Sequence, residues 1–242
     1  MKRFALVLAF FCSGLPCLAQ PNMEAIVDST TTFLVRDWIN DENFKEYYPP
    51  QVLLIKEGTK VYGACGDIVS GDDVDGSAYC RSSHTIYLVP EQLSVFYNAF
   101  GPSSVAYVIA HEFGHAIQAR YEVNLDQPQH ELQADCLAGV LINIGSEPLG
   151  ITREDTIQMA QAAYSIGDPT HGTGAQRAYS LMGGMGRVEM ECSPEAMAKL
   201  ASNQVDDPYY SELSQTRSGT GSIDLSPTPY PKSFSSLNQT LR

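Results

Sequence analysis

The sequence predicts an α+β domain in which a small β-sheet packs on a bundle of helices. Two short segments, 51–56 and 84–89, are rich in branched and aromatic residues and are bounded by turn residues, as β-strands are. Beyond residue 100, longer segments carry apolar residues at helical spacing instead. The chain of 242 residues is long enough for one good-sized domain with a core of its own.

The first 19 residues have the composition of a secretory signal peptide. Lys2 and Arg3 precede an apolar run over residues 4–15, and small residues up to Ala19 form a cleavage site. The run is too short to span a bilayer, and an uncleaved anchor is the alternative. We therefore expect an exported bacterial protein, periplasmic or secreted, without stable membrane insertion once the signal is removed.

The elements that follow are one helix and two strands. Residues 24–43 predict an amphipathic helix, and Pro49 with Pro50 ends that region. The segments QVLLIK (51–56) and HTIYLV (84–89) predict the strands. Together they supply the sheet and its first covering helix.

The stretch AYVIAHEFGHAIQAR (106–120) carries the pattern H-E-x-x-H on a predicted helix. Residues four apart lie on one face of a helix, so His111 and His115 point the same way. Glu112 lies about 100° around the axis from His111, at the edge of that face. Two neutral imidazoles on one buried face suit a divalent metal, and the glutamate suits a general base.

A second helix is predicted over HELQADCLAGVLINIG (130–145). The short connection between the helices allows an antiparallel return, so Glu131 can meet the two histidines as a third ligand. Asp135, one turn further, can accept a hydrogen bond from the free ring nitrogen of His111. Gly114 leaves room where the second helix or a substrate approaches. A solvated helix face is the alternative for Glu131 and Asp135.

Residues suited to starting a helix precede four predicted helices. They are Ser103 or Ser104 before the first, Pro128 before the second, Thr152 with Asp155 before a helix over 152–166, and Thr173 with Gln176 before a helix over 173–185.

The two motif segments, YVIAHEFGHAIQ and ELQADCLAGVL, resemble those of the bacterial neutral zinc metallopeptidases. The segments YYPPQVLLI, ACG, AYC, IYLVP and THGTGAQR resemble further blocks of that family in the same order, so the resemblance spans residues 30–192. One departure is Gly174-Ala175, where the family usually has a Ser-Glu pair.

The resemblance implies a zincin-like fold, a Zn²⁺ cofactor and hydrolysis of peptide bonds in a protein or peptide substrate. His111, His115 and Glu131 would hold the metal and leave one position open for water. Glu112 would act as general base. In zinc peptidases a strand beside the cleft pairs with extended substrate, and TIYLV within 84–89 is the candidate, with a plain core strand as the alternative.

Two other functions stay open at this point. The domain could be a non-catalytic peptide-binding module whose zinc site is vestigial or structural. A structural site would need a fourth protein ligand. His130 is the spare residue near Glu131, although it points away along the helix. A zinc hydrolase acting on another amide is the remaining option. The sequence names neither a cleavage specificity nor an oligomeric state.

His171 lies in a turn, THGT, just before a predicted helix. Turns held by rigid elements often carry function. We expect an imidazole here to donate to the oxyanion that forms on the scissile carbonyl. The alternative is that His171 braces its own turn against Asp168.

Four cysteines remain after the signal peptide: Cys65, Cys80, Cys136 and Cys192. An even number in an exported protein predicts disulfides. Cys65 and Cys80 flank a turn-rich loop and form the first expected pair. Cys136 and Cys192 then pair by elimination.

Composition separates the metallopeptidase domain, expected over 20–201, from the rest of the chain. Residues 202–242 are rich in Ser, Thr and Pro and predict a disordered tail. The formal net charge of −13 argues against binding of nucleic acid or of an anionic membrane.

Overall fold

The structure is a computed structural model that describes residues 22–57, 60–61, 69–70 and 77–215. In this part of the chain it has eight helices, a three-stranded sheet and a separate two-stranded pair, so the α+β class is confirmed. The elements in chain order are α1 (Met23–Asn40), β1 (Gln51–Leu54), β2 (Lys60–Val61), β3 (Val69–Ser70), β4 (Ser77–Cys80), β5 (Thr85–Leu88), α2 (Pro90–Phe100), α3 (Ser103–Arg120), α4 (Gln129–Ile144), α5 (Arg153–Ser165), α6 (Gly174–Gly184), α7 (Pro194–Ala201) and α8 (Pro208–Gln215).

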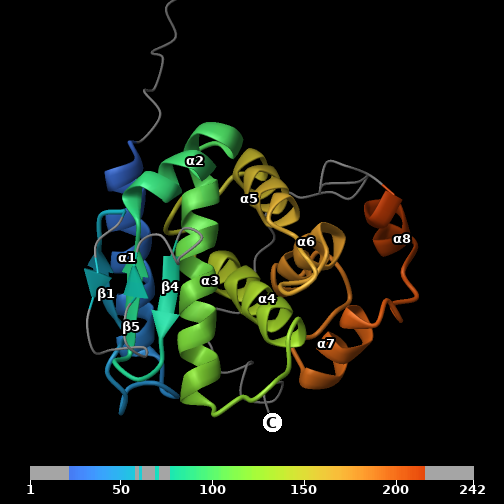
Figure 1. Cartoon of the computed structure of the whole chain (residues 1–242), viewed down its shortest axis with the longest axis horizontal. Coiled ribbons are helices and arrows are strands. Elements are labelled where there is room, and N and C mark those ends of the chain that lie inside the picture. The colour runs from blue at the N-terminus through green and yellow to red at the C-terminus, as the bar shows by residue number, and fades with distance from the viewer. Residues whose placement is uncertain (1–21, 58–59, 62–68, 71–76, 216–242) are drawn as a thin grey trace, which may run out of the picture.

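The main sheet has the strand order β1-β5-β4. β5 pairs parallel with β1, with Gln51 opposite Thr85, and antiparallel with β4, with Ser77 opposite Leu88. All four residues of β5 are buried. The segment 84–89 contains β5, which is the central strand because it pairs with a strand on each side. It has no free edge to pair with substrate, so its expected place beside substrate is wrong. β4 is the strand with the more extensive contact to α3 (Figure 1), and it lies at the edge of the sheet that the structure describes.

Helix α3 lies at the centre of the molecule, between the sheet and the helices α4 to α8 (Figure 1). Helices α1, α4 and α5 pack on α3, and α4 packs in turn on α6. Every residue from Ser103 to Gly114 in α3 is buried, as is every residue from Glu131 to Asn143 in α4. Polar groups on these two helices therefore need partners inside the protein.

Helices α3 and α4 approach each other closely at Gly114. A methyl group at this position would lie 2.7 Å from the carbonyl oxygen of Ala134 and 3.2 Å from its Cα. The expectation that Gly114 leaves room for the second helix is confirmed.

The expected starts of α4, α5 and α6 are also confirmed. Pro128 immediately precedes α4. Full capping boxes join Thr152 to Asp155 and Thr173 to Gln176.

The expected serine cap of α3 is wrong, because Pro102 occupies the N-cap position and no side chain caps the helix. The Ser103 hydroxyl donates to Asp155 of α5 instead. Ser104 donates to the carbonyl of Gly101 at 2.7 Å. Both serines thus fasten the start of α3 to its surroundings rather than to its own amides.

One disulfide joins Cys136 in α4 to Cys192, which lies in the irregular segment before α7. This expected pair is confirmed. The other expected pair includes Cys65, which lies outside the described residues, as does the predicted signal peptide. In the described part of the chain, no helix has both the length and the apolar character to cross a bilayer.

The segment expected to be a disordered tail contains helix α8, which packs on α6. Tyr210 and Leu213 of α8 are 5% and 0% exposed. The tail prediction is therefore wrong for residues 202–215, because a few apolar side chains are enough to dock this polar stretch. Residues 216–242 lie outside the described part.

Candidate active site

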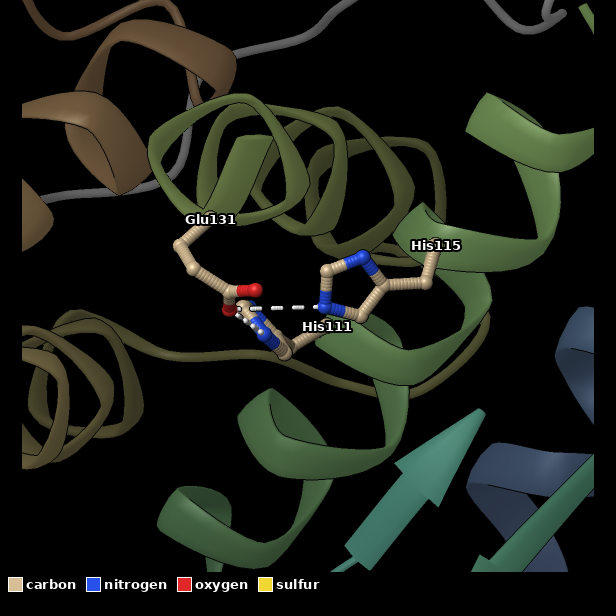
Figure 2. Close-up of side chains that lie close together, drawn as sticks. All are labelled: His111, His115 and Glu131. Carbon is tan, nitrogen blue, oxygen red and sulfur yellow. Dashed lines mark ion pairs between the residues drawn. The ribbon is translucent and has the colours of Figure 1, made fainter. Parts of the chain in front are cut away.

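Three side chains from the two motif helices meet in one place. His111 and His115 come from α3 and Glu131 from α4, and both rings face the carboxylate (Figure 2). Nε2 of His111 and Nε2 of His115 lie 3.3 and 3.4 Å from Oε2 of Glu131. Because the three ligand atoms lie within 4.8 Å of one another, the group could hold a metal ion.

The donor set fits zinc. Two imidazole nitrogens and one carboxylate are a common catalytic zinc set, with the fourth position open. His130 does not join the group: its ring stacks on that of His115, with centroids 4.9 Å apart. Its Nδ1 is 3.7 Å from the other oxygen of Glu131. No fourth ligand-type side chain completes the group among the residues described.

The ring of His111 is held from behind by Asp135, whose carboxylate is wholly buried. Nδ1 of His111 lies 2.8 Å from Oδ1 of Asp135. Arg177 of α6 binds both carboxylate oxygens, at 2.8 and 3.0 Å, and the Tyr107 hydroxyl donates to Oδ1 at 2.6 Å. A ring that binds a metal through Nε2 carries its proton on Nδ1, so Asp135 can fix its orientation.

The charges around Asp135 and Glu131 stabilise both carboxylates in their ionised form. Burial raises the pKa of Asp135, but the Arg177 guanidinium and His111 outweigh it and bring that pKa to about 2. Burial also raises the pKa of Glu131, but hydrogen bonds from the neighbouring histidines hold it well below its usual range. For His111, burial lowers the pKa, yet Asp135 raises it to about 10. The site therefore offers ionised carboxylates to a cation.

His115 has an amide rather than a carboxylate behind it. Its Nδ1 lies 2.8 Å from Oε1 of Gln118, which is one turn along α3 and 1% exposed. This partner was not predicted from the sequence.

Glu112 lies beside the three-residue group without being part of it. Its side chain lines the same cleft as the group. The hydroxyl of Ser77, the first residue of β4, donates to Oε1 of Glu112 at 3.2 Å. A carboxylate next to the candidate metal ligands, with a hydroxyl donor at 3.2 Å and access to the cleft, can exchange a proton with a molecule bound there.

The cleft that contains these residues has a volume of about 900 Å³. One wall is β4, and apolar side chains of α2 line it further along. His171 and Asp168 also line the cleft. Nδ1 of His171 lies 2.6 Å from Oδ2 of Asp168, and the other oxygen of Asp168 accepts from the backbone amide of His171 at 2.8 Å. His171 thus makes the turn contact of the alternative interpretation and also lines the cleft.

Comparison with known proteins agrees with the resemblance carried by the motifs. The family described as "Putative neutral zinc metallopeptidase" matches residues 20–126. This match includes His111, Glu112 and His115 and ends before Glu131. The family resemblance and its zinc cofactor are confirmed, whereas the third ligand rests on the geometry of α4.

The chain is also similar to the protein YpfJ of Escherichia coli, in strain K12 and in strain O6:H1. Identity is 28% over 167 residues, which cover 55% of this chain and 56% of the relative in each case. The chain therefore matches about half the length of these curated relatives, whose printed name is "Uncharacterized protein YpfJ". No solved structure matches.

Sequence reasoning missed three residues that support the site: Tyr107, Gln118 and Arg177. Signals for all three were present. Gln118 ends the block YVIAHEFGHAIQ, Tyr107 begins it, and Arg177 ends THGTGAQR. Polar residues inside blocks of otherwise buried sequence are candidates for partners of the ligands, because buried polar groups are nearly always hydrogen-bonded.

Proposed function

We propose that this protein is a zinc-dependent peptidase that hydrolyses peptide bonds, with Glu112 as general base. The observation that carries the proposal is the convergence of His111, His115 and Glu131 at an open cleft, with a second carboxylate beside them that is not part of the group. A structural zinc site has no use for that second carboxylate.

The chemistry divides between the metal and the chain's own residues. Zn²⁺ bound by the three side chains supplies Lewis-acid chemistry, which favours loss of a proton from water and attack on a carbonyl carbon. The carboxylate of Glu112 accepts the proton of the attacking water and then delivers it to the nitrogen of the leaving amine. The Ser77 hydroxyl orients Glu112 through its hydrogen bond at 3.2 Å.

Strand β4 is suited to bind extended substrate. It lies at the edge of the described sheet and lines the cleft through Ser77, Ala78 and Tyr79. An extended peptide can add to such an edge by main-chain hydrogen bonds, which suit many sequences. Val95 and Phe96 of α2 line the cleft as well, so peptides with bulky apolar side chains are the preferred class.

His171 is proposed as the donor to the oxyanion. His171 lines the cleft, and Asp168 accepts from Nδ1 of its ring, so Nε2 can donate only in the imidazolium, which carries a proton on both nitrogens. A preorganised donor of this kind stabilises the charge that develops on the carbonyl oxygen. We further propose export as the location, in line with the leader-like start of the sequence.

The test is Glu112→Gln in the mature protein, assayed for bound zinc and for cleavage of a mixed peptide library. Gln is isosteric, so zinc content should stay at the wild-type level while the hydrolysis rate falls by about 10²–10⁴-fold. Wild-type protein stripped by a chelator should be equally inactive and should recover when zinc is added.

Two results would redirect the proposal. Zinc loss in a folded Glu112→Gln variant would mean that Glu112 is a ligand. A zinc-loaded wild-type protein that binds library peptides but cleaves none would favour the non-catalytic binding module. Cleavage of other amides but no peptides would favour a different zinc hydrolase.

A further inference from the structure

A continuous chain of hydrogen bonds runs from His115 to the disulfide. Nδ1 of His115 lies 2.8 Å from Oε1 of Gln118. Nε2 of Gln118 donates to the carbonyl of His130 at 2.8 Å and to Oε1 of Gln133 at 3.0 Å. Nε2 of Gln133 donates to the carbonyl of Cys192 at 2.8 Å. Gln118 and Gln133 are 1% and 0% exposed, so water does not replace these partners.

Which group donates and which accepts in each of these hydrogen bonds is set by the Cys192 carbonyl at the end of the series. Backbone carbonyls only accept, so the Cys192 carbonyl requires the amide nitrogen of Gln133 to face it. The oxygen of Gln133 then faces Gln118, and the His130 carbonyl independently requires the nitrogen of Gln118 on that side. The oxygen of Gln118 must therefore face His115, where it can only accept.

This order selects one tautomer of His115. In the neutral imidazole, which is the form that binds a metal, an acceptor at Nδ1 requires the ring proton there, and this leaves the lone pair on Nε2. Nε2 is the atom that faces Glu131, at 3.4 Å. The chain thus prepares His115 to bind a metal before any metal is present.

The disulfide holds the end of the chain in place. Cys192 lies in the irregular segment between α6 and α7, and Cys136 lies in α4 one turn after Gln133. The covalent bond keeps the Cys192 carbonyl next to Gln133. We infer that Gln118 and Gln133 are positioning residues that hold His115 in its metal-binding tautomer, and that the Cys136–Cys192 disulfide anchors them. The inference rests on the proposed function only for the choice of zinc as the metal.

The experiment measures zinc affinity of the metal-free mature chain by competition with a chromophoric chelator, without any hydrolysis assay. Gln118→Met keeps the shape of the side chain but removes the acceptor, and zinc should bind about 10–100-fold more weakly. Gln133→Met should weaken zinc binding less, because the amide of Gln118 still donates to the His130 carbonyl and so stays oriented. Gln129→Met is the matched control on α4 outside the chain and should bind zinc as the wild type does.

A second variant separates tautomer selection from general packing. Gln118→Glu keeps an acceptor at His115 but turns an oxygen toward two other acceptors. It should therefore retain zinc affinity within a few-fold while its thermal stability falls. In ¹⁵N NMR spectra of the metal-free protein, the Nδ1-protonated form of His115 should dominate in the wild type and in Gln118→Glu, and should lose that dominance in Gln118→Met.

The disulfide is tested with the paired variant Cys136→Ser/Cys192→Ser. Zinc affinity should fall about as far as in Gln133→Met, and combining the two changes should add little, because both break the same link. Wild-type affinity in a folded Gln118→Met would overturn the inference, and full additivity would overturn the role of the disulfide. Tight zinc binding without any hydrolysis would overturn the proposed function and leave this inference standing.

Discussion

Replacing Gly114 by Ala tests whether close helix packing holds the site together. Gly114 lies between His111 and His115 along α3 and faces α4. The added methyl would lie 2.7 Å from the carbonyl oxygen of Ala134 and 3.2–3.3 Å from two more of its backbone atoms. Backbone atoms cannot rotate away as the end of a flexible side chain can, so one helix must shift.

Two opposing effects set the size of the change. Ala is favoured over Gly in a helix interior by about 1 kcal/mol. Overpacking a filled core costs about 1–3 kcal/mol, and contact with backbone on a buried helix belongs near the upper end. The free energy of unfolding should therefore fall by about 1–2 kcal/mol. Because α4 carries Glu131, its displacement should also weaken zinc binding.

The assay is urea unfolding of the metal-free protein, followed by the fluorescence of the single tryptophan, Trp38, with zinc titration of the folded variant alongside. Ala119→Gly in the same helix is the control. It should lose about 1 kcal/mol through helix propensity alone and leave zinc affinity unchanged. An unfolding free energy for Gly114→Ala equal to the wild type or higher would refute the packing argument.

Three further predictions concern other parts of the molecule. Burial, and secondly the nearby Asp41 carboxylate, raise the pKa of Asp37 to about 6. Ionisation of Asp37 therefore lowers the free energy of unfolding progressively as pH rises from about 4 to 6, and the loss is complete above that range. After allowance for solvent screening, Asp37→Asn should stabilise the protein by about 1 kcal/mol at pH 8 and not at all near pH 3.5, as thermal unfolding at both pH values would show. Leu213→Ala should cost about 2–3 kcal/mol in urea unfolding because Leu213 is wholly buried, whereas no loss would mean that α8 does not dock in solution. His171→Ala should lower kcat by about 10²-fold with zinc and KM little changed, and normal kcat in a less stable protein would assign His171 to its turn instead.

The sequence was sufficient to predict the two motif helices and the pairing of His111 with Asp135. Both follow from local rules: side chains four apart share a helix face, and a short connection returns the second helix beside the first. The contact of Arg177 with Asp135 could not be predicted from such rules, because Arg177 lies in α6, 42 residues further along the chain. Only the packing of α6 on α4 brings that guanidinium to the buried carboxylate.

The errors have equally specific causes. β4 reads SAYC, whose Ser and Ala have little preference for strands, so the central strand β5 was taken for the edge. The segment holding α8 is polar on average, and average composition hides the spacing of Tyr210 and Leu213, three residues apart on one face of a helix. Tertiary contacts with α6 decide the structure there.

The two histidines of the site have hydrogen-bond partners of different charge, so replacing these partners should affect the stability of the fold differently. Asp135 behind His111 is charged, and Arg177 must balance it because an unpaired buried carboxylate is costly. Gln118 behind His115 is neutral and needs no counterion, but its amide must be oriented by other amides and carbonyls. Loss of Arg177 would therefore leave a buried charge and destabilise the fold, whereas loss of Gln118 leaves the charge unchanged and removes only neutral hydrogen bonds, to His115, to the His130 carbonyl and to Gln133. The neutral side of the site is thus where zinc affinity can change with the least damage to folding.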